Sequence, residues 1–242
     1  MMVEADGDVF GFIKEANTFG KEGVPWLHAV IKGRFDKDTR ELRFTKTYDG
    51  SAEVVHGVQY RGTINTDGDK IRGTWEIPGD WGADFSLQRT AGAEPGRFPA
   101  TGVWAGTYSY PPDAERAPVK FWMIVVRGGV EVVGFIKEPN TFGEGDDPWL
   151  HAVVKGRYDP EERKLIFTKT YDGTSGINHD VSYEGRLSGD AAELSGTWDI
   201  PGVWNGKFTA QKVPPADWGK LKLTEPVKVE KRKLEKPHPA EK

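Results

Sequence analysis

A lysine and a tyrosine, two residues apart in a strand-like segment, are the best candidates in this chain for contacting a small molecule. The segment Leu42–Gly50 reads LRFTKTYDG, and Leu165–Gly173 repeats it as LIFTKTYDG. Alternate residues of a strand face the same side, so Lys46 and Tyr48 continue the face that begins with leucine and phenylalanine. In an apolar pocket, an ammonium group can pair with a ligand carboxylate or phosphate, and a phenol can orient the ligand.

The same reasoning extends this candidate site to an aromatic residue on each of the next two strands. The predicted ligand-binding residues are Lys46, Tyr48, Tyr60 and Trp75 in the first half of the chain, and Lys169, Tyr171, Tyr183 and Trp198 in the second. The alternative is structural: Lys46 would extend to solvent at the end of its strand, and the tyrosines would complete a core.

Two aromatic loops form a second candidate site. Each loop has the sequence Asn-Thr-Phe-Gly and precedes a Pro-Trp pair. We expect Phe19, Trp26, Phe142 and Trp149 to form an exposed patch at one end of each domain. Such a patch serves either as a binding surface or as a cover for the mouth of a cavity.

Motifs for other chemistries are missing from the sequence. The chain has no cysteine, which excludes thiol catalysis, cysteine-ligated zinc and iron–sulfur clusters. His28 and His56 recur as His151 and His179, but no zinc-binding spacing accompanies them, so we predict no metal site and can name no cofactor. We find no nucleophile elbow, phosphate-binding loop or dinucleotide fingerprint. We therefore expect a binding protein rather than an enzyme.

These candidate residues occur twice because the chain repeats itself. Val9–Arg89 aligns with Val132–Lys212 without a gap, and GFIKE, PWLHAV and FTKTYDG recur in both. A tandem repeat predicts two similar domains. We place the first repeat at 1–89, a linker rich in glycine, proline and alanine at 90–100, the second repeat at 101–212, and a lysine- and proline-rich tail at 213–242.

Each repeat reads as successive strands with period-two alternation, separated by short turns. The strands predicted in the second repeat are 103–110, 119–126, 131–137, 149–158, 164–171, 181–187, 193–200 and 205–211. Consecutive hairpins favour an up-and-down antiparallel barrel over a sandwich, so the predicted fold is all-β, with two tandem barrels.

The first barrel is expected to lack its opening strands, because Met1 aligns with Ile124 in the middle of the second strand. Either the chain is truncated there, or the missing strands come from elsewhere, such as a second copy. The tail is expected to be a flexible, solvated segment. Alternatively, the alternating Leu221, Leu223, Val227 and Val229 form an edge strand that fills the gap.

The overall charge limits the kinds of partner that we expect, and the apolar segments limit the expected compartment. The net charge is −4 and the isoelectric point is about 5.8, which argue against nucleic acid as a partner. No apolar run approaches the roughly 18 residues of a membrane span, and no signal peptide is visible. We expect a cytoplasmic protein, although a secretion signal could have been lost with the missing strands.

Gly102-Val103-Trp104, a G-x-W motif on the first strand of an eight-stranded unit, resembles the calycin superfamily of lipocalins, fatty-acid-binding proteins and avidins. The resemblance implies a closed barrel that holds one small apolar or heterocyclic ligand. It also implies that a basic residue late in the last strand packs over the tryptophan, which corresponds to Lys212 here and to Arg89 in the first repeat. The lipocalin T-D-Y-type signature and the avidin biotin site are missing, so no family ligand residues are carried over.

These observations together favour non-catalytic binding of a small, partly apolar ligand inside a barrel. The alternatives are a protein-interaction scaffold with filled barrels, and a barrel isomerase or cyclase that uses the lysine and tyrosine as acid or base.

Overall fold

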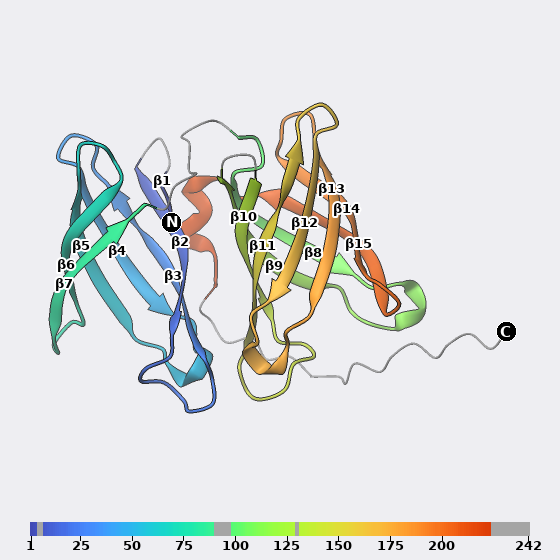
Figure 1. Ribbon diagram of the computed structural model, residues 1–242, viewed down its shortest axis with the longest axis horizontal. Helices are drawn as coiled ribbons and strands as arrows, with labels where there is room; N and C mark the ends of the chain where they lie inside the picture. The colour runs from blue at the N-terminus through green and yellow to red at the C-terminus, as the bar shows by residue number, and fades with distance from the viewer. Residues whose placement is uncertain (4–6, 90–97, 129–130, 224–242) are drawn as a thin grey trace. The chain divides into compact units, whose positions relative to one another are not determined.

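The computed structural model describes residues 1–3, 7–89, 98–128 and 131–223, whose regular structure is β-strand apart from four short 3-10 helices (Figure 1). The chain divides into two compact units. The first contains strands β1 to β7 together with a short segment that follows β15 in the sequence. The second contains β8 to β15. Within the described ranges, no helix is long and apolar enough to cross a membrane. Most of the expected linker, 90–97, lies outside the described residues.

The second unit is a closed, eight-stranded antiparallel barrel, as predicted. Its strands are β8 (Gly102–Ser109), β9 (Val119–Gly128), β10 (Glu131–Pro139), β11 (Trp149–Asp159), β12 (Lys164–Tyr171), β13 (Asp180–Leu187), β14 (Glu193–Ile200) and β15 (Trp204–Lys212). Each strand pairs with the next, and β15 closes the barrel by pairing with β8. Closure leaves the backbone groups of every strand with a neighbour on both sides.

The first unit is an open sheet with the same strand sequence but without closure, which confirms the predicted incomplete barrel. Its strands are β1 (Met2–Val3), β2 (Asp8–Ala16), β3 (Trp26–Phe35), β4 (Glu41–Tyr48), β5 (Gly57–Ile64), β6 (Lys70–Glu76) and β7 (Gly82–Gln88). Strand β1 stands where β9 stands in the barrel, and no described strand corresponds to β8. Strands β1 and β7 are therefore the two edges of this sheet.

Glycines on the inner face let the small barrel hold bulky aromatic residues. A Cβ atom at Gly206 would lie 2.7 Å from the indole Nε1 of Trp198 on the neighbouring strand. A Cβ atom at Gly185 would lie 2.7 Å from the ring of Phe208. Only glycine leaves room for these rings, so the glycine and aromatic positions on facing strands depend on each other.

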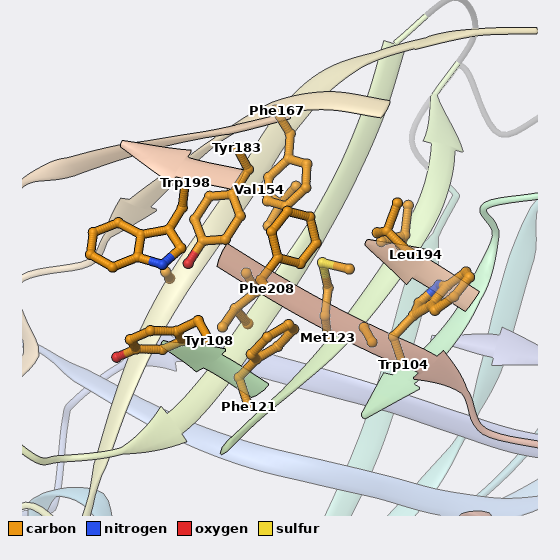
Figure 2. Close-up of a cluster of buried hydrophobic side chains, with 14 of the residues drawn as sticks. Trp104, Tyr108, Phe121, Met123, Val154, Phe167, Tyr183, Leu194, Trp198 and Phe208 are labelled. Atoms are coloured by element: carbon orange, nitrogen blue, oxygen red, sulfur yellow. The ribbon is translucent and has the colours of Figure 1, made fainter. Parts of the chain in front are cut away.

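The barrel interior is packed with side chains at the end that contains Trp104 (Figure 2). The Trp104 indole donates a hydrogen bond of 2.9 Å to the carbonyl of Ala100. The ammonium group of Lys212 lies 5.0 Å from the centroid of the Trp104 ring and donates to the carbonyl of Pro99 at 2.6 Å. The packing of Lys212 over this tryptophan, expected from the resemblance, is thus observed. Arg89 has no equivalent tryptophan among the described residues, because no described strand of the first unit corresponds to β8.

The first residues of the C-terminal tail match neither of the two structures expected for them. Residues Pro215–Lys220 form the 3-10 helix η4, neither a solvated coil nor an edge strand. The buried Trp218 packs on Phe10 of β2, with ring centroids 5.3 Å apart. Lys32 donates a hydrogen bond of 2.9 Å to the carbonyl of Leu221. The other part of the tail, including Val227 and Val229, lies outside the described residues.

Candidate functional site

Strand alternation carries Lys169 and Tyr171 into the barrel, as the sequence predicts. Along β12 the inner face reads Leu165, Phe167, Lys169 and Tyr171, and all four are buried. The equivalent residues of β4, including Lys46, are buried as well. The alternative in which Lys46 extends to solvent is therefore wrong: its side chain is buried, and its ammonium group bonds to Glu15.

That partner is a glutamate on a neighbouring part of the sheet. In the barrel, Lys169 donates hydrogen bonds to Glu138 Oε2 at 2.6 Å and to the Tyr171 hydroxyl at 2.7 Å. The Tyr171 hydroxyl in turn donates to Glu138 Oε1. The three side chains, here called the barrel trio, close a ring of hydrogen bonds.

The open sheet contains the same arrangement, here called the sheet trio. Lys46 donates to Glu15 Oε1 at 2.5 Å and to the Tyr48 hydroxyl at 2.7 Å. The Tyr48 hydroxyl donates to the same glutamate oxygen at 2.5 Å. The trio is therefore a feature of the repeat: its members come from two strands with one strand between them, and it does not require a closed barrel.

Burial removes water from the charged side chains of the barrel trio and shifts the pKa of its members. The side chains of Lys169 and Glu138 are each only 1% exposed. Desolvation lowers the pKa of Lys169, and the attraction of Glu138 opposes this shift. Desolvation, followed by the charge of Glu138, raises the pKa of Tyr171 well above its ordinary value, so this phenol remains protonated. Two buried charges of opposite sign are tolerated only because each satisfies the other.

A cavity of about 280 Å³ lies beside the barrel trio, two of whose members, Lys169 and Tyr171, line it. Its lining residues come from the inner faces of β8 and β12 to β15 and from the adjoining loops. They are Tyr108, Tyr110, Phe142, Lys169, Tyr171, His179, Val181, Tyr183, Trp198, Ile200, Val203 and Trp204. Lys169 and Tyr171 are fully buried, whereas Tyr110, Phe142 and Trp204 are half-buried, so the cavity runs from the barrel interior toward its surface.

The cavity wall is dominated by aromatic rings packed edge to face. The ring of Trp198 lies 5.8 Å from Tyr108 and 5.5 Å from Tyr110, and Tyr110 lies 5.8 Å from Trp204. The indole of Trp198 is held by a hydrogen bond of 3.1 Å to the carbonyl of Ser109. These contacts fix the wall before any ligand arrives.

The predicted ligand residues of the second repeat come together in one cavity, whereas in the first repeat Lys46 and Tyr48 are buried and the two aromatic residues beyond them are more open. Lys169, Tyr171, Tyr183 and Trp198 all line the cavity. In the first repeat, Tyr60 stacks on Phe44 with centroids 4.6 Å apart, and Trp75 contacts the exposed Trp81 at 4.7 Å. Tyr60 and Trp75 are only half-buried there.

The aromatic loops of the two units differ in how far their rings are exposed. Phe19 is 56% exposed and Trp26 is half-buried, but Phe142 lines the cavity, 5.9 Å from Tyr171. The expected exposure is wrong for Trp149, which is fully buried. Its ring packs against the Lys137 ammonium at 4.3 Å and against the Trp122 ring at 5.6 Å.

The asparagine of each aromatic loop shapes its backbone. In the second unit, the side chain of Asn140 accepts a hydrogen bond of 2.8 Å from the Gly143 amide. It also donates to the carbonyl of Asp147 at 2.8 Å. Asn17 makes equivalent bonds to Gly20 at 2.6 Å and to Val24 at 2.8 Å. The recurring motif is therefore a loop-forming device, and in the barrel this loop places Phe142 over the cavity.

Glu138 is the functional residue that the candidate list missed, although the sequence contains its signal. In β10 it follows Val132, Gly134 and Ile136 on the inner face, so an acid stands where alternation predicts an apolar residue. Tyr108, also missed, approaches Glu138 Oε1 at 3.5 Å.

His179, for which the sequence suggested no metal-binding role, lines the cavity, 5.0 Å from the Tyr171 ring. Desolvation, followed by the charge of Lys169, lowers the pKa of His179 below its ordinary value. Among the residues that the structure describes, no group of three or more histidines, cysteines or acids could hold a metal ion.

Comparison with known proteins adds no family assignment: no protein-family model and no curated protein sequence matches this chain. Inferences about function therefore depend on the geometry of the cavity.

Proposed function

We propose that the second unit binds one small, largely apolar ligand in the cavity beside the barrel trio and does not convert it chemically. The observation that carries the proposal is a cavity of about 280 Å³ whose wall is mostly aromatic and whose base holds buried polar groups. Ligand sites are typically such apolar hollows with a few polar groups at fixed positions. The volume suits a compact ligand, since drug-sized pockets begin at about 300 Å³.

The architecture of the barrel supports the same proposal. The packing of Lys212 over Trp104 at the filled end matches what a calycin-like barrel would have. The cavity shares Tyr108, Tyr183 and Trp198 with the core cluster of Figure 2, whereas Trp104 and Lys212 do not line it. We therefore include a calycin-type mode of binding in the proposal, with the ligand held inside the barrel rather than on its outer surface.

The two rival functions have less support. A scaffold with a filled barrel accounts for the packed end in Figure 2 but not for the cavity beside Lys169. An isomerase or cyclase would need Tyr171 or Lys169 to exchange a proton with its substrate. Both already bond to Glu138, and the pKa of Tyr171 is raised well above its ordinary value, which disfavours proton release.

A matched pair of cavity variants tests the proposal. Val181 lies buried on the cavity wall, and Val58 is its counterpart in the open sheet. We expect Val181→Phe to fill the cavity and to weaken binding of the neutral fluorescent probe N-phenyl-1-naphthylamine by about tenfold or more. Val58→Phe should leave the affinity unchanged. Equal binding by Val181→Phe and the unmodified chain, or no binding by the latter, would overturn the proposal.

A further inference from the structure

The base of the cavity has a polar donor but no net charge. Lys169 and Glu138 are both buried and hydrogen-bonded at 2.6 Å, so together they contribute zero charge whichever of them holds the shared proton. Tyr171 is neutral because burial raises its pKa well above the ordinary value, and His179 is neutral near pH 7 because burial lowers its pKa. Arg116 lies at the outer side of the aromatic wall, 5.4 Å from the Tyr110 ring.

The hydrogen bonds of the barrel trio leave a donor for a ligand. An ammonium group has three donors, and Lys169 directs one to Glu138 and one to Tyr171. Lys169 itself lines the cavity. On the acceptor side, Glu138 Oε1 already receives the Tyr171 hydroxyl and lies 3.5 Å from the Tyr108 hydroxyl. The cavity therefore offers a ligand one N–H donor, while its carboxylate is already occupied.

On this basis, and resting on the proposed ligand cavity, we propose that the site selects uncharged aromatic ligands with one hydrogen-bond acceptor, and that Glu138 sets this selectivity. The acceptor, such as a ketone or amide oxygen, would take the third N–H of Lys169. Edge-to-face rings such as Tyr108, Trp198 and Tyr110 suit a flat aromatic body.

A charged ligand is disfavoured by the same charge balance. A ligand carboxylate would place a second negative group beside Lys169, which Glu138 already neutralises. The cavity would then hold one uncompensated buried charge, an arrangement that proteins avoid. A cationic ligand would face the Lys169 ammonium at the base of the cavity. An anion therefore fits only when the charge of Glu138 is removed.

Two naphthalene ligands of nearly equal shape test this selectivity by calorimetric titration of the full chain near pH 7.5. They are 2-acetonaphthone, which is neutral and carries a ketone acceptor, and 2-naphthoate, which is an anion. We expect the unmodified chain to bind the ketone at least about tenfold more tightly. Glu138→Gln keeps the shape but leaves Lys169 uncompensated, and we expect it to reverse the preference. Glu15→Gln, the matched change in the sheet trio, should leave the preference of the unmodified chain unaltered.

A second variant covers the case in which Glu138→Gln fails to fold. The double variant Glu138→Gln/Lys169→Met removes both charges, and we expect it to retain the preference for the ketone while binding it more weakly, because the donor is lost. Equal or tighter binding of 2-naphthoate by the unmodified chain, an unchanged ratio in folded Glu138→Gln, or a preference for 2-naphthoate in the double variant would overturn the selectivity alone. Failure of the unmodified chain to bind either ligand or N-phenyl-1-naphthylamine would overturn the proposed function as well.

Discussion

The closed barrel and the open sheet contain the same trio of side chains in different surroundings. In the barrel, the side chains of Lys169 and Glu138 are each 1% exposed; in the sheet, Lys46 is 4% exposed but Glu15 is 34% exposed. The hydrogen-bonded geometry is thus built by local strands, and closure of the barrel changes mainly the access of water to the carboxylate.

The strand that is missing from the open sheet, β8, and the loop after it also supply part of the cavity wall. Strand β8 contributes Tyr108 to the wall, and the loop after it contributes Tyr110. Without these elements, the inner face of the sheet leaves Trp81 59% exposed and Leu87 45% exposed. The comparison teaches that the trio alone does not make a ligand site, because an enclosed apolar wall is also required.

The largest expected difference between the two units follows from removing the lysine. Lys169→Met leaves the Glu138 carboxylate buried without its cation, and we expect it to destabilise the barrel by about 3–5 kcal/mol. Lys46→Met should destabilise the sheet by about 1 kcal/mol or less, since water reaches Glu15. Hydrogen exchange of peptides from β12 and β4, followed by mass spectrometry, reports the two units separately. Equal losses in both units would show that burial of the carboxylate is not what distinguishes them.

The second largest difference in stability between the two units is expected at alkaline pH. Burial raises the pKa of Tyr108, Tyr171 and Tyr183 well above 10, so their contribution to stability is present below pH 10 and is lost as the pH rises further. The lowered pKa of Lys169 has the opposite effect on the pH dependence of stability, but this one lysine is outweighed by the three tyrosines. Burial also raises the pKa of Tyr48 and Tyr60 in the sheet, but Tyr60 is only half-buried there, so we expect β12 peptides to lose protection from exchange above pH 10 more steeply than β4 peptides. A steeper loss in β4 would contradict this assignment of the buried phenols.

A smaller effect is expected at the filled end of the barrel. Lys212→Met removes a cation over the Trp104 ring and a hydrogen bond to the Pro99 carbonyl, and we expect a loss of about 1–2 kcal/mol in urea denaturation. Arg89→Met, the matched change in the first unit, should stay within about 0.5 kcal/mol, because no described strand there corresponds to β8. A loss of the same size for Arg89→Met would indicate a partner for that arginine and weaken the comparison.

Strand periodicity was sufficient to predict the fold and the inward face of β12. Alternation also contained the signal for Glu138, which was missed because the predicted strand 131–137 ended one residue before this acid, whereas β10 continues to Pro139. The full lining of the cavity could not be predicted from the sequence, because Val203 and Trp204 reach it through the packing of β15 against β8. Trp149 was misjudged because its burial depends on Lys137 and Trp122, which come from two other strands.

The central claim is that one of the two units, the closed barrel, holds a ligand. Native mass spectrometry of the full chain with 2-acetonaphthone measures this directly as the number of ligands retained per chain. We predict one ligand per chain, none after Val181→Phe, and one after Val58→Phe. Two ligands per chain, none, or a loss caused by Val58→Phe rather than by Val181→Phe would contradict the claim.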